Sequence, residues 1–330
     1  MASMLSLLVP THRSAGTIER TLRAAMAQRY RPLEICLYDE ASDDGTREIV
    51  APLLDQATAR GIDVDFQTSE ENSGPVRAWR VPLHRARGEW CAFVWADDVL
   101  RPDYAERMMA ATEGAEAAGR ALVFSSAELE IDGRRVIKYA ADAAILDPLE
   151  FSLGIFLRRY SLNQVNGIYE TAAARRIFDR HMAIDNPLGF DYLTYPYGND
   201  VGFLSELGVE GGGVEVLGER LVTLVLSRRS MTRFAMGTHL WQFRWQYTWS
   251  FYRVWRRWQQ QGVPGAARLA RLAERRLALC QLMLHRGPGW FAPRRLLQAF
   301  GAVADYLRLD YERRPRSLEE HRALVEELRA

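Results

Sequence analysis

The chain has 330 residues, 48% hydrophobic and 26% charged, a composition typical of a globular protein with one large domain or two. No uninterrupted apolar run approaches the roughly 18 residues that a membrane-spanning helix needs. The first apolar run, Met4 to Val9, lacks the charged start of a signal peptide. Cys36, Cys91 and Cys280 lie too far apart for a disulfide framework or a metal knuckle, so we expect reduced thiols in a cytoplasmic protein.

The net charge of +1 conceals an uneven distribution. Residues 1–227 carry 23 basic and 34 acidic side chains, a net charge of −11, whereas residues 228–330 carry 20 and 8, a net charge of +12. This contrast fits an anionic acceptor, a membrane surface or attraction between two domains. Every basic residue except Lys138 is arginine, a bias that genome composition can produce. We therefore give arginine clusters no weight and expect no nucleic-acid partner.

The first hundred residues alternate apolar runs with helical patterns, which predicts an α/β fold with a mostly parallel sheet and helices on both faces. Apolar runs predict strands at Met4–Val9, Leu33–Tyr38 and Ile62–Gln67, and at a run that begins at Glu89. Helices are predicted at Ile18–Gln28, with Thr17 as its cap, at Arg47–Arg60, and after the loop that starts at Asn72.

Two adjacent carboxylates, Asp97 and Asp98, follow the fourth apolar run. A strand buried on both faces would place them at the carboxyl edge of the sheet, where open α/β sheets bind ligands. Neighbouring carboxylates repel unless a positive group lies beside them, and a divalent cation bound to a diphosphate is one such group. The alternative interpretation is a polar turn with a helix cap, because Asp is common in both.

Known nucleotide-binding loops are missing. The turn from Pro10 to Gly16 lacks the three-glycine spacing of a dinucleotide-binding fold, and the sequence contains no P-loop. Nucleotide contacts would therefore come from side chains at several strand ends.

Four blocks of sequence together resemble the family 2 inverting glycosyltransferases with the GT-A fold. In chain order they are Val9–Arg13, Tyr38–Thr46, Asn72–Arg80 and Gly88–Asp98, and a fifth, Gly198–Leu204, resembles the later acidic motif of that family. The first four blocks match the family in order and spacing over residues 1–110. The resemblance implies a UDP- or dTDP-sugar donor and a divalent metal, Mn or Mg.

The resemblance assigns the nucleotide to the first three strand ends. Asp39 would accept a hydrogen bond from the imide N–H of uracil or thymine, a donor that cytosine lacks; alternatively it is a strand-end turn residue. Arg77 would meet ribose or phosphate, since a guanidinium forks well onto phosphate oxygens, with a surface salt bridge as the alternative. The other residues expected at the nucleotide sugar are Pro10, Thr11, Arg13 and Asn72. Asp43 and Asp44 are expected to cap the following helix.

By the same resemblance Asp97 would serve the ribose and Asp98 the metal, which offsets charge on the departing diphosphate. Many relatives carry a further Asp where this chain has Trp95, so the ligand set of the metal stays open. Arg228 and Arg229 lie where relatives often have a histidine, and either would contact the diphosphate; a solvated loop is the alternative.

Asp200 is the candidate general base. Inversion requires one displacement in line with the leaving group, and a carboxylate opposite the diphosphate can take the proton of the acceptor hydroxyl. The family usually shows Glu-Asp here, and this chain has Asn199-Asp200. The alternative is a helix cap, because the apolar run that starts at Val201 follows directly.

The pattern becomes helical after Gly237. Five of the nine tryptophans fall within Trp241–Trp258, which holds no acidic residue, and a helix with so wide an apolar face is usually buried against its own protein. The alternative is peripheral contact of 241–258 with a lipid surface or a lipid-linked acceptor. Later helices are predicted at Ala266–His285, Arg294–Leu309 and Leu318–Arg329.

We therefore predict a GT-A domain over residues 1–235, with a nucleotide-sugar half (1–110) and an acceptor half (111–235), and a helical C-terminal region over residues 236–330. The expected activity is metal-assisted, inverting transfer of a hexosyl unit from a UDP- or dTDP-sugar to a glycan, lipid-linked or small-molecule acceptor, in the cytoplasm or at the inner face of the membrane. The alternatives are a nucleotidyltransferase, disfavoured because no glycine-rich basic loop follows the first strand, and a nucleotide-sugar-binding protein without turnover.

Overall fold

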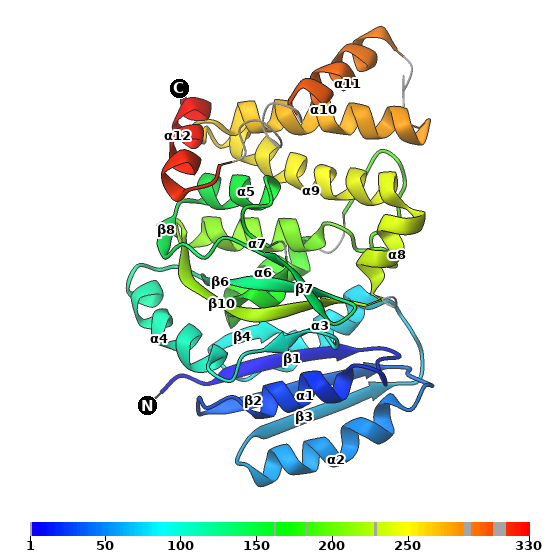
Figure 1. Cartoon of the computed structure of the whole chain (residues 1–330), viewed down its shortest axis with the longest axis vertical. Coiled ribbons are helices and arrows are strands. Elements are labelled where there is room, and N and C mark those ends of the chain that lie inside the picture. The colour runs from blue at the N-terminus through cyan, green and yellow to red at the C-terminus, as the bar shows by residue number, and fades with distance from the viewer. Residues whose placement is uncertain (1, 162, 182–183, 228–229, 287–291, 306–314) are drawn as a thin grey trace.

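A computed structural model of the chain describes residues 2–161, 163–181, 184–227, 230–286, 292–305 and 315–330. Figure 1 shows a sheet in the lower part of the molecule and a stack of helices above it. Eight strands of the described chain follow one path, in the order β3-β2-β1-β4-β9-β6-β10-β5, while β7 pairs with β6 and β8 with β10. The predicted α/β sheet followed by a mainly helical region is confirmed.

The first half alternates strands and helices as predicted. Its elements are β1 (Leu5–Thr11), α1 (Ile18–Met26), β2 (Leu33–Glu40), α2 (Thr46–Ala59), β3 (Asp63–Ser69), α3 (Pro75–Arg85) and β4 (Trp90–Phe93). The four strands are parallel, and Leu5 of β1 lies opposite Leu33 of β2 and Trp90 of β4. All four residues of β4 are buried, as its apolar run predicts.

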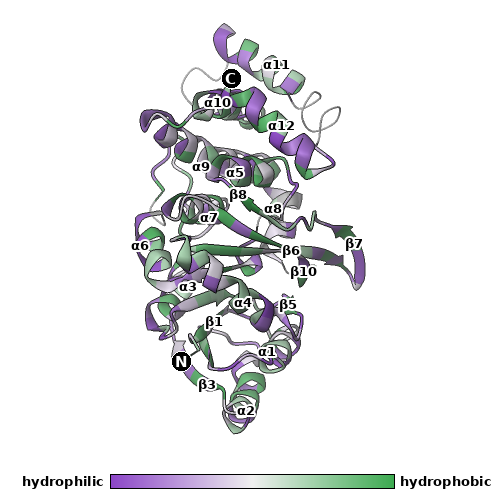
Figure 2. Ribbon diagram, turned by 90° about the vertical axis from the view of Figure 1, so that its left-hand side faces the viewer, coloured by the Kyte–Doolittle hydropathy of each residue, from purple (hydrophilic) through white to green (hydrophobic). Residues whose placement is uncertain are grey.

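The middle of the chain completes the sheet with strands of both directions. Its elements are β5 (Val99–Leu100), α4 (Tyr104–Ala117), β6 (Leu122–Ile131), β7 (Arg134–Lys138), β8 (Ala144–Leu146), α5 (Pro148–Phe156), η1 (Gln164–Asn166), β9 (Gly167–Glu170), α6 (Thr171–His181), α7 (Asn199–Glu210) and β10 (Val214–Leu226). The long β10 runs parallel to β6 and ends beside the loop that follows β4. In Figure 2, β6 is green where it crosses the interior, and β7 projects at the side with purple residues.

Alternate residues of β1 face two separate cores, so helices cover both faces of the sheet as predicted. Leu5 and Leu7 pack with buried residues of α1, α2 and α4, such as Leu22 and Met108. Leu8 faces the other way and belongs to a core that α3, α5, α6, α7 and α9 share. Cys36, Cys91 and Cys280 are free and buried, and burial raises the pKa of all three thiols.

Two predicted helix caps differ from the structure. Thr17 occupies the N-cap of α1, but its hydroxyl donates to the Ser14 carbonyl and accepts no amide hydrogen bond. The Arg20 amide, which a capping hydroxyl would accept, donates instead to the Thr17 carbonyl at 3.1 Å. Asp44 does bind the Thr46 amide at the start of α2, whereas Asp43 forms an ion pair with Arg13.

The C-terminal helices are α8 (Met231–Thr238), α9 (Leu240–Gln260), α10 (Ala266–Leu284), α11 (Pro293–Asp305) and α12 (Leu318–Arg329). The helices α9 to α12 match the predicted ones closely, whereas α8 was not predicted; residues 306–309, predicted as the end of the helix that starts at Arg294, lie outside the described residues. The helix α9 lies along α7, and α12 lies against α5 (Figure 1). No helix in the described part of the chain is both long and apolar enough to cross a bilayer. The division at residue 235 stays a prediction.

Most of the aromatic face of α9 is buried inside the protein. Trp245, Trp255 and Trp258 are at most 1% exposed, and the indole N–H of Trp255 donates to Ser152 Oγ on α5 at 2.9 Å. The wide apolar stripe therefore joins the helical layer to the core above the sheet, while Trp241 and Trp249 keep partial exposure.

Replacing Trp255 by Ala should lower the free energy of unfolding by about 3–5 kcal/mol, because the change leaves a cavity among Phe156, Phe251 and the rest of that core. Urea unfolding followed by circular dichroism would measure it. Gln260→Ala, at the exposed end of the same helix, is the control and should change stability by less than about 0.5 kcal/mol. A loss below about 1 kcal/mol for Trp255→Ala would contradict the integration of α9 into the core.

Candidate functional site

Polar side chains gather where the parallel strands end. Thr11 at the end of β1 lies opposite Asp39 near the end of β2, and Asn72 follows β3. Asp97 and Asp98 follow β4, which runs in the same direction. These ends share one edge of the sheet, on the side where α8 lies in Figure 1. The expectation that the strand-end residues lie along one edge is met.

The two carboxylates after β4 are held by the end of β10 and the residue before α8. The Val225 amide donates to Asp98 Oδ1 at 2.9 Å, and the Ser230 hydroxyl donates to Asp97 Oδ2 at 3.0 Å. Burial raises the pKa of both carboxyls, and the charge of Asp97 raises that of Asp98 further. Such a pair holds negative charge at a cost in free energy, which a cation would offset.

Asp98 has one carboxylate oxygen that is available as a ligand for a divalent cation. Its Oδ2 is buried and has no hydrogen-bond partner in the described part of the chain, which leaves one hard oxygen ligand free. The described residues contain no group of three or more His, Cys, Asp or Glu side chains that could hold a metal. A cation here would therefore take most of its ligands from diphosphate oxygens and water, as Mg²⁺ and similar ions commonly do.

Trp95 fills the place where relatives often have an additional Asp. Its ring stacks on Phe93 at 5.4 Å between centroids, and its indole N–H donates to Asn163 Oδ1 at 2.7 Å. Asn163 also lies close enough to Asp98 to lower the pKa of that carboxyl, against the larger effect of burial. Sequence reasoning missed Asn163, because nothing in its neighbourhood marks it as a partner of residues about 65 positions earlier.

Asp39 is fully buried and already bonded. The Arg47 Nε donates to its Oδ2 at 2.6 Å, and the Ser42 hydroxyl donates to its Oδ1 at 2.5 Å. The Ser42 amide also donates to Oδ2, at 3.3 Å. Because each oxygen of an ionised carboxylate can accept two hydrogen bonds, only Oδ1 keeps capacity for one more. Arg47 was not anticipated from the sequence.

The loop after β1 contributes polar groups of different exposure. The Thr11 hydroxyl is buried and has no hydrogen-bond partner among the described residues, and Pro10 is buried in the same strand. Arg13 is exposed and paired with Asp43 at 2.7 Å. His12, to which we assigned no role, lies between the Glu40 carbonyl and the Asn72 amide. It therefore connects the loops that follow β1 and β3.

The loop that enters α3 presents an exposed cation. Arg77 contacts Ser73 Oγ at 3.2 Å and forms no ion pair within the described residues, so the salt-bridge alternative is not what the structure shows. Asn72 Oδ1 accepts the Gly74 amide, which shapes the loop before the helix starts. Gly74 has φ +92° and lies close to the Leu193 carbonyl, at 3.1 Å from an added Cβ. The segment that precedes Asp200 therefore packs on this loop.

Asp200 lies in the first turn of α7. Gly198, with φ 90°, takes the N-cap position, so Asp200 is not the cap itself. The Tyr247 hydroxyl donates to Asp200 Oδ2 at 3.1 Å, and the Val201 amide donates to Oδ1 at 3.0 Å. Burial raises the pKa of Asp200 to about 7, although the hydrogen bond from Tyr247 acts to lower it. A carboxyl with such a pKa can exchange a proton near neutral pH.

A short chain of contacts connects Asp200 to the loop after β4. Phe203, one turn later on α7, meets Phe93 at 6.0 Å between ring centroids. Phe93 ends β4 and stacks on Trp95, next to the carboxylate pair. Together with the packing of Leu193 on Gly74, these contacts bring the start of α7 toward the edge that carries the other acids.

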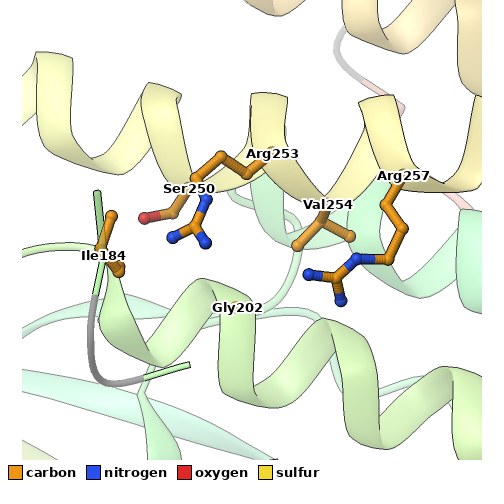
Figure 3. Close-up of a pocket in the computed structure, with 6 residues that line it drawn as sticks. All are labelled: Ile184, Gly202, Ser250, Arg253, Val254 and Arg257. Carbon is orange, nitrogen blue, oxygen red and sulfur yellow. The ribbon is translucent and has the colours of Figure 1, made fainter. Parts of the chain in front are cut away.

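The helices α7 and α9 run side by side in the same direction. Tyr247 meets Asp200, and about three turns further along α9 Arg257 pairs with the buried Glu206. Figure 3 shows Arg253 and Arg257 extending from α9 toward α7 beside Gly202, where they line a small cavity. This arrangement fixes Asp200 on one side against the helical region. Arg228 and Arg229, expected at the diphosphate, lie outside the described residues.

Comparison with known proteins agrees with this geometry. Residues 6–169 match the model of the family described as "Glycosyl transferase family 2". The succinoglycan biosynthesis protein ExoO of Rhizobium meliloti is 29% identical over 188 residues, which cover 57% of this chain and 51% of that protein. The chain thus spans about half the length of this curated relative, and less of the next ones.

Two solved structures share the fold. The S. aureus TarS fragment 1-349 in complex with UDP-GlcNAc aligns with a TM-score of 0.57 at 16% identity, covering 92% of this chain and 81% of that one. The mannosyltransferase PcManGT from Pyrobaculum calidifontis, in complex with GDP-Man and Mn²⁺, aligns with a TM-score of 0.51 at 16% identity, covering 99% and 84%. With its GT-A-type sheet, this chain carries a glycosyl transferase family 2 domain over residues 6–169.

Proposed function

We propose that this protein is a metal-assisted, inverting glycosyltransferase that moves a hexosyl unit from a UDP- or dTDP-sugar to an acceptor hydroxyl. Two acidic sites are the main support: the Asp97–Asp98 pair at the sheet edge, and Asp200 at the start of α7 with a pKa near 7. The family match and the sugar nucleotides in the two similar structures, UDP-GlcNAc and GDP-Man, agree with it.

Each residue has one task in the proposed reaction. Asp39 selects the base and Asp97 binds the ribose, while Thr11, Arg13, Asn72 and Arg77 hold ribose and diphosphate. Asp98 would bind the divalent cation, which offsets the charge that develops on the departing diphosphate when bound. Asp200 takes the proton of the acceptor hydroxyl as the new bond forms on the face opposite the diphosphate, which inverts the anomeric carbon.

The acceptor class is a glycan, a lipid-linked sugar or a small molecule. ExoO is named for the biosynthesis of succinoglycan, a fact that favours a glycan or its lipid-linked precursor. We also propose a cytoplasmic location, which the three free buried thiols favour.

Nucleotide release from a panel of UDP-, dTDP- and GDP-sugars, with and without Mn²⁺, tests the proposal. We expect UDP or dTDP release that requires Mn²⁺ or Mg²⁺ and speeds up when an acceptor is added. Binding without release, over a broad acceptor set, would favour the non-catalytic alternative. Pyrophosphate as the product from a sugar phosphate and a nucleoside triphosphate would indicate a nucleotidyltransferase.

Asp39→Asn should weaken UDP binding about tenfold and narrow the preference for UDP over CDP. The NH₂ group of the Asn side chain cannot accept a hydrogen bond from the imide N–H of uracil. It can donate to the ring nitrogen that cytosine has at the same position. Isothermal titration with UDP and CDP in Mn²⁺ would measure both changes. Asp55→Asn, an exposed carboxylate on α2, is the control and should leave both affinities as they are. An unchanged UDP affinity in Asp39→Asn would remove this residue from base recognition.

A further inference from the structure

We propose that Tyr247, on helix α9, is a positioning residue that holds the Asp200 carboxylate in the orientation in which it meets the acceptor hydroxyl. The inference rests on the proposed role of Asp200 and extends the site into the helical region. Neither the family match, which ends at residue 169, nor the sequence pattern points to this tyrosine.

The hydrogen bonds of Asp200 support this role. Oδ2 accepts from the Tyr247 hydroxyl at 3.1 Å and Oδ1 from the Val201 amide at 3.0 Å. With one donor on each oxygen, the rotation of the carboxylate is fixed from both sides, and each oxygen keeps one lone pair for another partner. The Val201 donor belongs to the backbone of α7, so Tyr247 is the side chain that sets the orientation.

Tyr247 is itself held firmly. Its ring packs on Phe243 at 4.6 Å between centroids, and its backbone lies against Gly198, where an added Cβ would be 3.0 Å from the Tyr247 Cα. The neighbouring Gln246 donates to the Tyr195 carbonyl at 2.9 Å and accepts from the Tyr192 hydroxyl through its own carbonyl at 3.2 Å. The segment before Asp200 is thus attached to α9 at several points. The distance between the hydroxyl and the carboxylate cannot drift unless these contacts break.

The Tyr247 hydroxyl matters electrostatically because no cationic side chain among the described residues pairs with Asp200. No arginine, lysine or histidine pairs with Asp200 among the residues that the structure describes, and the other titratable groups that face it are Tyr169 of β9 and, through Tyr247, Tyr197 and Arg158. Burial and the charge of Asp200 raise the pKa of Tyr247, so the phenol stays protonated and remains a donor over the working pH range. A donor to the charged form stabilises that form.

Tyr247→Phe tests the proposal. Loss of the donor should raise the pKa of Asp200 by about one pH unit. The hydrogen bond from Tyr247 stabilises the ionised carboxylate more than the protonated carboxyl, so its removal favours the protonated form. The rate is measured with Mn²⁺ and the UDP-sugar that gives the fastest UDP release. The acidic limb of log(kcat/KM) against pH should then shift to higher pH by about one unit. At pH 6 the rate should fall about tenfold, with little change in the KM for the donor.

A titration that does not depend on turnover separates this inference from the proposed function. The Asp200 carboxyl signal in protein labelled with ¹³C-aspartate is identified as the one missing in Asp200→Asn, and its midpoint is followed in both backgrounds. We expect a midpoint near 7 that rises in Tyr247→Phe. Undiminished turnover in Asp200→Asn would reject the base assignment, while this midpoint would still report on Tyr247.

Tyr252→Phe is the matched control on the same helix. Its hydroxyl also donates to a carboxylate, Glu274 Oε1 at 3.3 Å, but on the side of α10. This variant should leave the acidic limb and the Asp200 midpoint in place. If Tyr247→Phe lowers the rate equally at every pH and leaves the midpoint unchanged, Tyr247 only stabilises the fold and the proposal is wrong.

Discussion

Asp200→Asn should reduce sugar transfer about 10³- to 10⁴-fold while UDP and Mn²⁺ bind as before. Proton removal by a positioned base contributes roughly 10²–10⁴ to a rate, and the loss of the Asp200 carboxylate removes that contribution. The residues proposed to bind the nucleotide lie at the ends of β1 and β2, after β3 and β4 and in the first turn of α3, so their geometry does not depend on the Asp200 charge. Single-turnover kinetics with isothermal titration of UDP would separate chemistry from binding.

Glu210→Gln provides the control for that variant. Glu210 lies at the other end of α7 and forms an ion pair with Arg176, so the same chemical change is made on the same helix away from the site. It should keep full turnover. If Asp200→Asn transfers sugar at the original rate, Asp200 has no part in the mechanism and another group must take the proton.

Asp200→Asn should also stabilise the protein at high pH. Asp200 has a pKa of about 7 when folded and about 3.9 when unfolded, so the folded form holds its proton more tightly. The contribution of this group to stability is therefore full below pH 4 and is lost as the pH rises through 7. Asp200→Asn should unfold at higher urea than the parent at pH 8, by on the order of 2 kcal/mol, and this gain should disappear near pH 4. Urea titrations at the two pH values would measure it.

The local pattern of apolar residues was sufficient to predict the strands and helices of the first half of the chain. The apolar runs that became β1, β2 and β4 are buried on both faces, and the acids Asp39, Asp97 and Asp98 follow from the ends of those runs. A strand end can be located from the chain alone, because hydrophobic periodicity stops there. The position of these carboxylates along one sheet edge then follows from parallel pairing.

The partners of the site residues could not be predicted in this way. Val225 and Ser230 hold the Asp97–Asp98 pair from more than 120 positions away, and Tyr247 reaches Asp200 from 47 positions away. Such contacts depend on how β10 and α9 pack, which no local pattern encodes. The Trp-rich helix shows the same limit: its spacing predicts an apolar face, yet only packing shows that Trp245 and Trp255 lie inside the protein.

Asp98→Asn should abolish the effect of the metal without weakening the fold. The Asn side chain keeps an oxygen for the Val225 amide, and it removes one of two adjacent buried charges, so thermal stability without metal should stay equal or rise. A neutral amide is a poorer ligand for a hard cation than a carboxylate. We therefore expect transfer to fall at least 10²-fold and the extra thermal stabilisation by UDP that Mn²⁺ provides to vanish. Chelation of the metal from the parent protein should give a similar loss.

Asp103→Asn tests whether that loss is specific to the pair. Asp103 lies five residues further along, beyond β5 at the N-cap of α4, and pairs with Arg101, so its amide variant should keep the Mn²⁺ response. If Asp98 binds the cation, the Mn²⁺ response is lost in Asp98→Asn and kept in Asp103→Asn. A metal response that survives in Asp98→Asn would mean that the cation is held by the diphosphate and Asp97 alone. A response lost in both variants would mean that the segment 98–103 as a whole, and not the free oxygen of Asp98, governs the cation.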